Sequence, residues 1–217
     1  CLHKIFEDVS FSSSKDLEEA VRNNLEYYGF AENWLQPVKE WISEVLHHRL
    51  GKSEPPLSGI SEEDVLKEME FFFPVQNIQA EELWKLIRNE GLKSSSPEQV
   101  SGFMKGFIDL TFKVGDTYYI LDYKSNHLGD ELSDYEDGKL SEAMKDAGYD
   151  LQYHIYTLAL HRFLKQRMNG YSYEEHFGGV MYLFMRGVDA EVPGSGVFFD
   201  KPDFSLIEQL DSYVQRG

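Results

Sequence analysis

The sequence predicts an α/β fold with a mixed central sheet, flanked by helices and preceded by a helical N-terminal subregion. Three observations carry this prediction: apolar residues recur at helical spacing early in the chain, strand-like apolar runs follow, and long helical segments come after those strands. Strands followed by long helices are typical of a sheet covered by helices. We expect one domain of 217 residues, with a mainly helical subregion at 1–66 and an α/β core at 67–217.

The first part of the chain is predicted to be mainly helical. Residues 15–50 contain helices, because acidic residues near the start suit the helix dipole and apolar residues then recur at helical spacing. A loop rich in Gly, Ser and Pro at 51–56 interrupts this pattern, and the acidic stretch 61–64 is predicted to start another helix. Residues 68–75 are predicted to form a strand, and residues 93–98 a second loop.

The second part of the chain differs in kind, because strands and long helices follow one another. Gly115 and Asp116 separate two strand-like runs, which is the signature of a short hairpin turn. The expected elements are strands at 103–114 and 117–124, an exposed loop at 126–138, one long helix at 140–168, a strand at 176–185 and a closing helix at 202–215.

Composition excludes several classes of protein. The chain is 41% hydrophobic and 27% charged, which is ordinary globular usage and excludes collagen-like or wholly disordered chains. Its apolar runs are shorter than the roughly 20 residues that span a bilayer, so no membrane role is expected. Cys1 is the single cysteine, so an internal disulfide and a cysteine-based zinc cluster are excluded. We expect a protein of the cytoplasm.

The net charge limits how the chain can bind nucleic acid. It holds 21 basic and 38 acidic residues, for a formal charge of −17. A field of this sign repels phosphates, so binding through the overall field is disfavoured. Any role with nucleic acid then depends on a local site or a metal ion.

The chain is expected to be a piece of a longer polypeptide, because it begins at Cys1 directly inside the helix-like run Leu2–Glu7. The sequence lacks a Gly-rich phosphate-binding loop ending in Lys and Ser or Thr.

The predicted hairpin brings chemical groups together. If the turn centres between Gly115 and Asp116, Asp109 faces Asp122, with Cβ atoms roughly 4.5–5.5 Å apart. Lys124 shares this face, because side chains two apart in a strand point the same way. Opposed carboxylates repel, and a shared proton, an interleaved lysine or a divalent cation relieves the repulsion. A cation beside a lysine suits hydrolysis of a phosphodiester.

A purely structural interpretation stands beside this one. An Asp within an apolar strand is usually a hydrogen-bonded core group or a strand-end residue. A slip of the register by one residue also places the two acids on opposite faces. The spacing of Asp109, Asp122 and Lys124 leaves both interpretations open.

Asp109, twelve intervening residues and then Asp122-Tyr123-Lys124 resemble the PD-(D/E)xK signature of the restriction-endonuclease-like superfamily, with Ile108 in place of its proline. Longer strings resemble one branch, the RecB-like nuclease domains of exodeoxyribonuclease V beta subunits, over essentially the whole chain. These strings lie at 105–110, 121–126, 149–153, 156–162, 176–180 and 182–187. The resemblance implies a restriction-endonuclease-like mixed sheet.

The resemblance also implies a metal site. In that family a histidine on an early helix and the two aspartates hold the ion, which corresponds to His3, Asp109 and Asp122. We expect Mg²⁺, with Mn²⁺ as an alternative, and the backbone carbonyl of Tyr123 as a further ligand. Lys124 is expected to orient or deprotonate the attacking water and to neutralise developing charge. Without the resemblance, His3 is interpreted as an ordinary surface or core histidine.

Three residues are supporting candidates. Gln152 and Tyr156 share one face of the predicted long helix, and they match a Gln-x-x-x-Tyr motif that the resemblance implies contacts DNA or shapes the site. Tyr156 also fits ordinary core packing. Glu68 is a candidate for a supporting acid, with Glu70 as its alternative, because their segment resembles a family strand that carries a glutamate.

The resemblance implies a DNA nuclease acting in double-strand break processing and recombinational repair. Its substrates are DNA, mainly single strands emerging from an ATP-driven helicase, and its implied partners are RecC- and RecD-like subunits. Two alternatives are weighed: a catalytically silent docking module of such a complex, and a metal-dependent phosphohydrolase of small molecules. The acids, lysine and histidine argue against the first, and the lack of a nucleotide-pocket motif argues against the second.

Overall fold

The computed structural model describes residues 1–11, 14–88 and 99–215 and shows a five-stranded mixed sheet in this part of the chain. The strands lie side by side in chain order, with antiparallel pairs except for the parallel pair of the third and fourth strands. They are β1 (Val65–Gln79), β2 (Gln99–Val114), β3 (Thr117–Lys124), β4 (Phe177–Phe184) and β5 (Val197–Asp200). The predicted α/β class with a mixed sheet is therefore confirmed.

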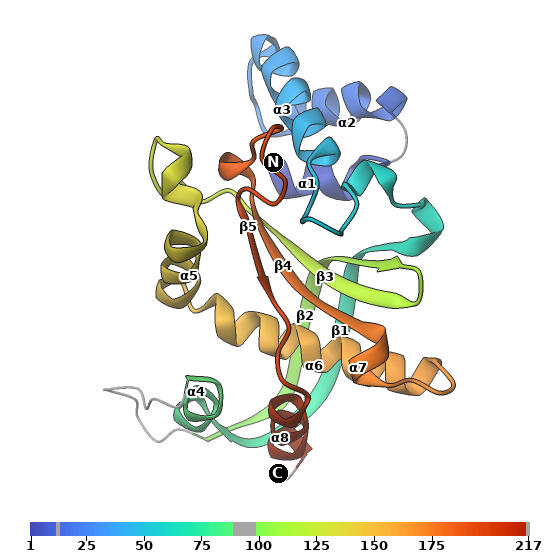
Figure 1. Cartoon of the computed structure of the whole chain (residues 1–217), viewed down its shortest axis with the longest axis vertical. Helices are drawn as coiled ribbons and strands as arrows, with labels where there is room; N and C mark the ends of the chain where they lie inside the picture. The colour runs from blue at the N-terminus through green and yellow to red at the C-terminus, as the bar shows by residue number, and fades with distance from the viewer. Residues whose placement is uncertain (12–13, 89–98, 216–217) are drawn as a thin grey trace.

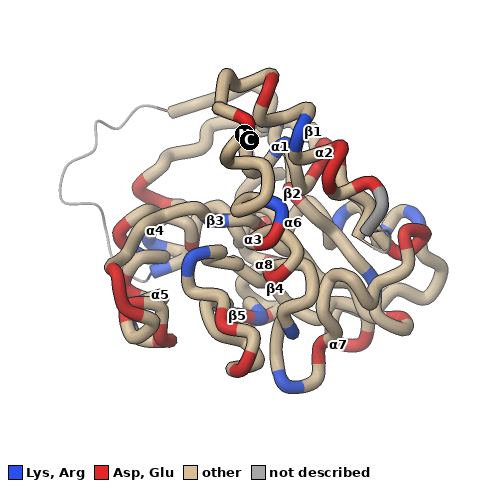
Figure 2. Tube along the Cα trace, turned by 90° about the horizontal axis from the view of Figure 1, so that it is seen from above, with Lys and Arg blue, Asp and Glu red and all other residues tan. Residues whose placement is uncertain are grey.

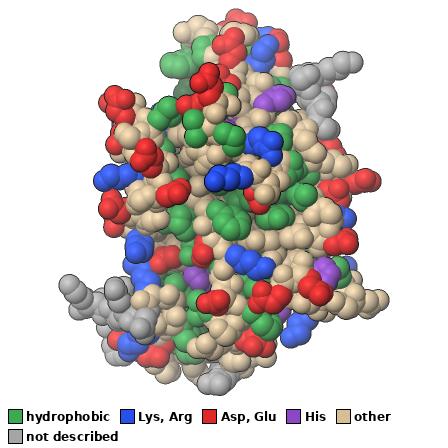
Figure 3. Space-filling view, in the orientation of Figure 1, with side chains coloured by type: hydrophobic (Ala, Val, Ile, Leu, Met, Phe, Trp, Pro, Cys, Tyr) green, Lys and Arg blue, Asp and Glu red, His purple; other side chains and the backbone are tan. Residues whose placement is uncertain are grey.

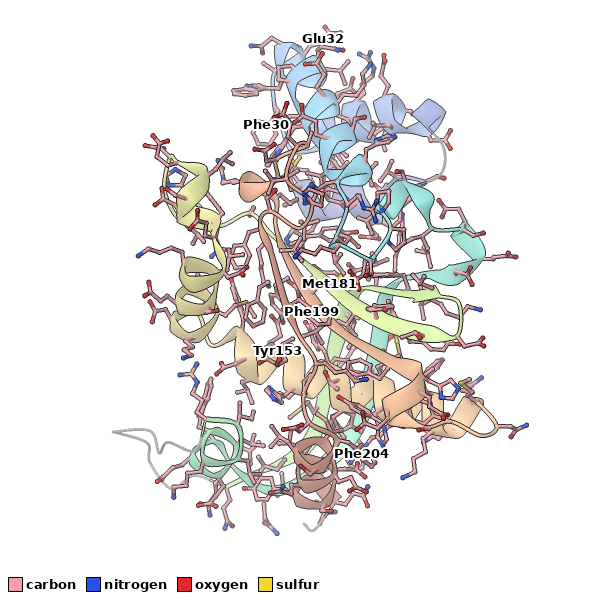
Figure 4. All side chains as sticks on the ribbon, viewed as in Figure 1. Phe30, Glu32, Tyr153, Met181, Phe199 and Phe204 are labelled. Carbon is pink, nitrogen blue, oxygen red and sulfur yellow. The ribbon has the colours of Figure 1, made fainter. Side chains whose placement is uncertain are left out.

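Helices lie at both ends of the sheet and across it (Figure 1). Three helices gather at one end, while the last helix lies at the opposite end. Figure 4 marks these two ends by Phe30 and Phe204. The helices are α1 (Leu2–Asp8), α2 (Ser14–Tyr27), α3 (Leu35–His47), α4 (Ala80–Arg88), α5 (Asp137–Asp146), α6 (Tyr149–Arg167), α7 (Tyr173–His176) and α8 (Phe204–Gln215).

The two faces of the sheet pack into two separate hydrophobic cores. Side chains alternate along a strand, so Ile120 joins the core beneath α6 and α8, whereas Leu121 joins the core formed with α1–α3. Tyr182 and Leu183 divide in the same way on β4. The sheet is thus covered on both faces near its centre, where β3 and β4 run.

The predicted long helix at 140–168 is wrong in one respect, because the structure divides it into α5 and α6. Gly148 lies between them with φ of +71°. This left-handed conformation costs glycine little, and it turns the chain between the two helices. The ring of Trp84 on α4 lies 3.4 Å from the position that a Cβ on Gly148 would take, so the backbone conformation rather than the space explains the glycine.

Other boundaries also differ from the prediction. The stretch 61–64 forms only a short 3₁₀ turn, Glu62–Asp64, because β1 begins directly afterwards and pairs with β2 from Val65 onward. The predicted exposed loop at 126–138 contains the 3₁₀ turn Leu132–Tyr135 and the start of α5. The sequence prediction misses α4 and β5. The predicted loop at 93–98 lies outside the described residues.

Charge is spread around the molecule. Figure 2 shows Asp and Glu along much of the periphery, and on the face seen in Figure 3 lysines and arginines are scattered among acidic and hydrophobic side chains. Among the helices that the structure describes, none has the length and apolar character needed to cross a membrane. A binding site for a polyanion must therefore be built locally.

Candidate active site

Strands β2 and β3 stop pairing with each other just before the two candidate aspartates, Asp109 and Asp122, and we call this point the fork. The ladder between β2 and β3 runs from Val114–Thr117 to Leu110–Leu121, which confirms the predicted register. Past that point β2 pairs only with β1, and β3 continues to pair with β4 through Lys124. Asp109 and Asp122 are the first residues beyond the last shared pair, so they do not oppose each other within a continuous ladder. Instead, each one stands on a different branch of the fork.

Asp109 is held from two sides. Its Oδ2 accepts a hydrogen bond from the backbone N–H of Tyr123 at 3.1 Å. The same oxygen lies 3.4 Å from Nδ1 of His3, which α1 brings against the sheet. The side chain of Asp109 is 17% exposed and that of His3 is 51% exposed. The fork therefore brings two of the predicted ligands, from opposite parts of the sequence, into contact at a solvent-accessible position.

Asp122 is buried and forms an ion pair with Lys124 Nζ through its Oδ1. Burial and, after it, the charge of Asp109 raise the pKa of Asp122 to about 7, although Lys124 acts to lower it. The structure thus brings Asp122 and Lys124 together, and it couples Asp122 electrostatically to Asp109.

Glu68 lies at an irregular point of β1 opposite this cluster. Its φ is +50°, a left-handed conformation that residues other than glycine rarely adopt. The irregularity changes which side chains face each core, because Lys67 reaches the backbone of α1 at Glu7 whereas Met69 packs beneath α6. Burial raises the pKa of Glu68, and the nearby charge of Asp109 adds to this effect.

Glu70, the alternative to Glu68, points elsewhere. It is exposed and forms an ion pair with Lys105 at 2.8 Å on the outer part of the β1–β2 ribbon. Asp109 is among the charges that raise the pKa of Glu68, so Glu68 is the glutamate that interacts electrostatically with the site. A supporting role for Glu68 stays a prediction.

A hydrogen-bonded network holds Lys124 from the side of α6. Lys124 Nζ donates to Gln152 Oε1 at 3.3 Å, and the Tyr182 hydroxyl donates to the same oxygen at 2.9 Å. Gln152 Nε2 then donates to the Tyr156 hydroxyl at 2.8 Å. Gln152 and Tyr156 therefore do more than pack: the amide connects the lysine to two tyrosines.

Two residues of this network are missed by the sequence analysis. The Lys124 ammonium lies 4.0 Å from the ring centroid of Tyr149 and 4.9 Å from that of Tyr182, distances at which a cation and an aromatic ring attract. Tyr182 lies in the strand predicted at 176–185, and the sequence assigns it no role in the site. Its position opposite Asp122 in the β3–β4 ladder is the signal that points to the site.

The donors at the fork fit a hard divalent cation in their chemistry. Two electrostatically coupled carboxylates supply the oxygen ligands that such a cation prefers, the His3 imidazole lies beside them, and a cation relieves the crowding of negative charge. In residues 1–11, 14–88 and 99–215, however, no three His, Cys, Asp or Glu side chains gather closely enough to form a complete metal site. Water or substrate oxygens are then needed to complete the coordination, as Mg²⁺ commonly requires.

The architecture defines a class of protein: a mixed sheet flanked by helices, consistent with the restriction-endonuclease-like fold. The chain matches no family model. It is 44% identical over 216 residues to the RecBCD enzyme subunit RecB of Escherichia coli. This match covers 97% of this chain and 18% of that protein. These residues are thus similar to one segment of RecB, consistent with a C-terminal domain.

Other RecB subunits show the same relation. The RecB subunit of Haemophilus influenzae is 38% identical over 217 residues, covering 97% of this chain and 18% of that protein. The RecB subunit of Mycobacterium tuberculosis strain H37Rv is 39% identical over 127 residues, covering 55% of this chain and 12% of that protein. The chain thus spans less than a fifth of the length of these relatives.

Proposed function

We propose that these residues form the nuclease domain of a RecB-like subunit and hydrolyse phosphodiester bonds in DNA with the help of a divalent metal ion. The observation that carries the proposal is the fork, where Asp109 and the Asp122–Lys124 ion pair lie on two different branches just beyond the last residues that β2 and β3 share. The similarity to RecB over 97% of the chain supports it. In this proposal residues 1–66 and 67–217 act together as one domain of a longer polypeptide.

The residues of the fork divide the chemistry among them. Asp109, Asp122, His3 and the backbone carbonyl of Tyr123 would hold Mg²⁺ or Mn²⁺. Such an ion polarises the scissile phosphate and lowers the pKa of a bound water. Lys124 orients the attacking water and neutralises charge that develops on the phosphate.

The residues around Lys124 hold its ammonium group in a fixed position and direction. Gln152 fixes its direction through one hydrogen bond, and the rings of Tyr149 and Tyr182 shield it from bulk water. Fixed groups that meet developing charge in a site of low dielectric stabilise a transition state more strongly than the same groups do in water.

We further propose the setting in which this site works. The relatives are described as subunits of the RecBCD enzyme, so we infer RecC- and RecD-like partners and a role in processing DNA ends for recombinational repair. The substrate is then DNA, mainly single strands delivered by an ATP-driven helicase elsewhere in the polypeptide. We place this activity in the cytoplasm.

Removal of divalent ions tests the proposal directly. The purified chain is expected to degrade linear single-stranded DNA with Mg²⁺. Cleavage should stop when EDTA is added and resume when Mg²⁺ is restored in excess. Mg²⁺ is also expected to raise the midpoint of thermal unfolding, because a ligand that binds only the folded state stabilises it, and Asp109→Asn should lose this rise. Absence of cleavage with every divalent ion, together with tight binding to a helicase subunit, would favour a silent docking module.

Tyr182→Phe tests the support of Lys124. The variant keeps the ring but removes the hydroxyl that donates to Gln152 Oε1. We expect kcat to fall about two- to tenfold with KM little changed, since one neutral hydrogen bond contributes about 0.5–1.5 kcal/mol. Tyr173→Phe is the matched control, because its buried hydroxyl donates to the Pro202 carbonyl away from the site. Equal losses of kcat in both variants would contradict a specific role for Tyr182.

A further inference from the structure

An exposed aromatic stripe runs along the β1–β2 ribbon next to the fork. Its rings belong to Phe72, Phe103 and Phe107, which are 59%, 65% and 44% exposed, respectively. Lys105 completes the stripe, and its side chain is also exposed. We call these four residues the aromatic stripe. Large exposed apolar side chains that lie together on a folded protein commonly mark a binding surface.

The register of the two strands explains why these side chains share a face. Phe72 pairs with Lys105, and Pro74 pairs with Phe103, so these residues point to the same side of the ribbon. The alternate residues of β1, such as Phe71 and Phe73, are buried beneath α6. The ribbon therefore uses one face for the core and presents the aromatic stripe on the other.

The contacts within the stripe give it the form of a stacking platform. The rings of Phe72 and Phe103 stack with centroids 4.5 Å apart and planes within 10° of parallel. Lys105 Nζ lies 5.4 Å from the ring centroid of Phe107 and so places a positive charge between the aromatic groups. Its ion pair with Glu70 lies on the surface, where such pairs contribute little energy and exchange readily.

The stripe leads directly to the candidate active site. Phe107 precedes Asp109 by two residues on β2, and Phe103 lies four residues further back. Since a strand rises about 3.3 Å per residue, the stripe extends over roughly 20 Å from the fork. A flexible polymer that enters the fork therefore has an aromatic surface along its path.

We propose that the aromatic stripe binds single-stranded nucleic acid by stacking unpaired bases on Phe103, Phe72 and Phe107, while Lys105 contacts a phosphate. The inference rests on the proposed function and deepens it, because it assigns the surface that carries the strand to the fork. Stacking suits a chain with net charge −17, since it attracts bases without an extended basic surface. It also tolerates any base, because every base has a flat face.

The test measures binding and cleavage separately. Binding of fluorescent oligothymidylate of about twelve nucleotides is measured in EDTA, so that no cleavage occurs, for the wild type and for Phe72→Ala/Phe103→Ala. We expect the double variant to bind at least tenfold more weakly, because each base stacked on an aromatic ring contributes substantially to affinity. Tyr27→Ala is the control, since this aromatic residue is 83% exposed but lies on α2 at the far end of the molecule.

Cleavage then distinguishes the stripe from a structural effect. With Mg²⁺, KM for the long strand is expected to rise about tenfold in the double variant with kcat little changed, while cleavage of a dinucleotide, too short to reach Phe103, stays as in the wild type. If the wild type cleaves DNA but the double variant binds the oligonucleotide and shows the KM of the wild type, the proposal for the stripe is rejected and the proposed nuclease function is retained. Lost binding without any wild-type cleavage would support the stripe and reject the proposed function.

Discussion

Asp122→Asn is expected to reduce cleavage of linear single-stranded DNA by about a thousandfold or more while leaving the chain folded. The substitution removes a charged ligand from the proposed ion and the partner of Lys124, and both effects act on the reacting phosphate. The fold should survive, because burial already raises the pKa of Asp122 to about 7 and a neutral amide of similar shape avoids burying that charge.

Initial rates of nucleotide release with Mg²⁺ measure this effect, and circular dichroism with urea unfolding measures the fold. Asp116→Asn is the matched control, because this aspartate is exposed in the hairpin turn and touches no group of the fork. Wild-type rates in Asp122→Asn would remove the assignment of the active site. If Asp122→Asn does not fold, Asp109→Asn takes its place, because the carboxylate of Asp109 is partly exposed in the wild type. We expect the same loss of cleavage in that variant.

Gly196→Ala is expected to lower the free energy of unfolding by about 3 kcal/mol or more. Gly196 has φ of +68°, and a Cβ there would lie 2.7 Å from the carbonyl oxygen of Phe184 and 2.7 Å from the carbonyl carbon of Gly187. Both obstacles are backbone atoms, so no side-chain rotation relieves them. The Phe184 N–H also donates to the Gly196 carbonyl at 2.8 Å, and this hydrogen bond would be distorted.

Urea unfolding monitored by tryptophan fluorescence measures the loss. Gly138→Ala is the control, because Gly138 lies within α5 with open space around its Cβ position, and alanine favours a helix. Phe184 pairs with Lys124 in the β3–β4 ladder, so the Gly196 variant should lose activity as well as stability. A change below about 0.5 kcal/mol would show that the loop before β5 adapts more freely than its packing indicates.

Local signals in the sequence are sufficient to predict the hairpin. A Gly-Asp turn between two apolar runs predicts how the strands on either side of it pair, and the observed register from Val114–Thr117 to Leu110–Leu121 agrees with that prediction. The same reasoning places Asp122 and Lys124 on one face. It also brings Asp109 to the same end of the hairpin.

Features that depend on distant parts of the chain are beyond such reasoning. The fork arises because β2 continues to pair with β1 while β3 continues to pair with β4. Neither β1 nor β4 is adjacent to the hairpin in sequence. The roles of Tyr149 and Tyr182 depend on how α6 lies across the sheet, which no spacing reveals. Likewise β5 is only four residues long and is stabilised by pairing with β4 rather than by its own composition.

Because the two aspartates belong to different branches, the separation of their carboxylates follows from the angle at which those branches diverge. The short ladder from Val114–Thr117 to Leu110–Leu121 acts as a hinge between the two branches, and one acid lies on each branch directly beside it. Substitutions that alter the twist of this paired segment, between Val114 and Leu110, should change the affinity for a metal ion without contacting either acid.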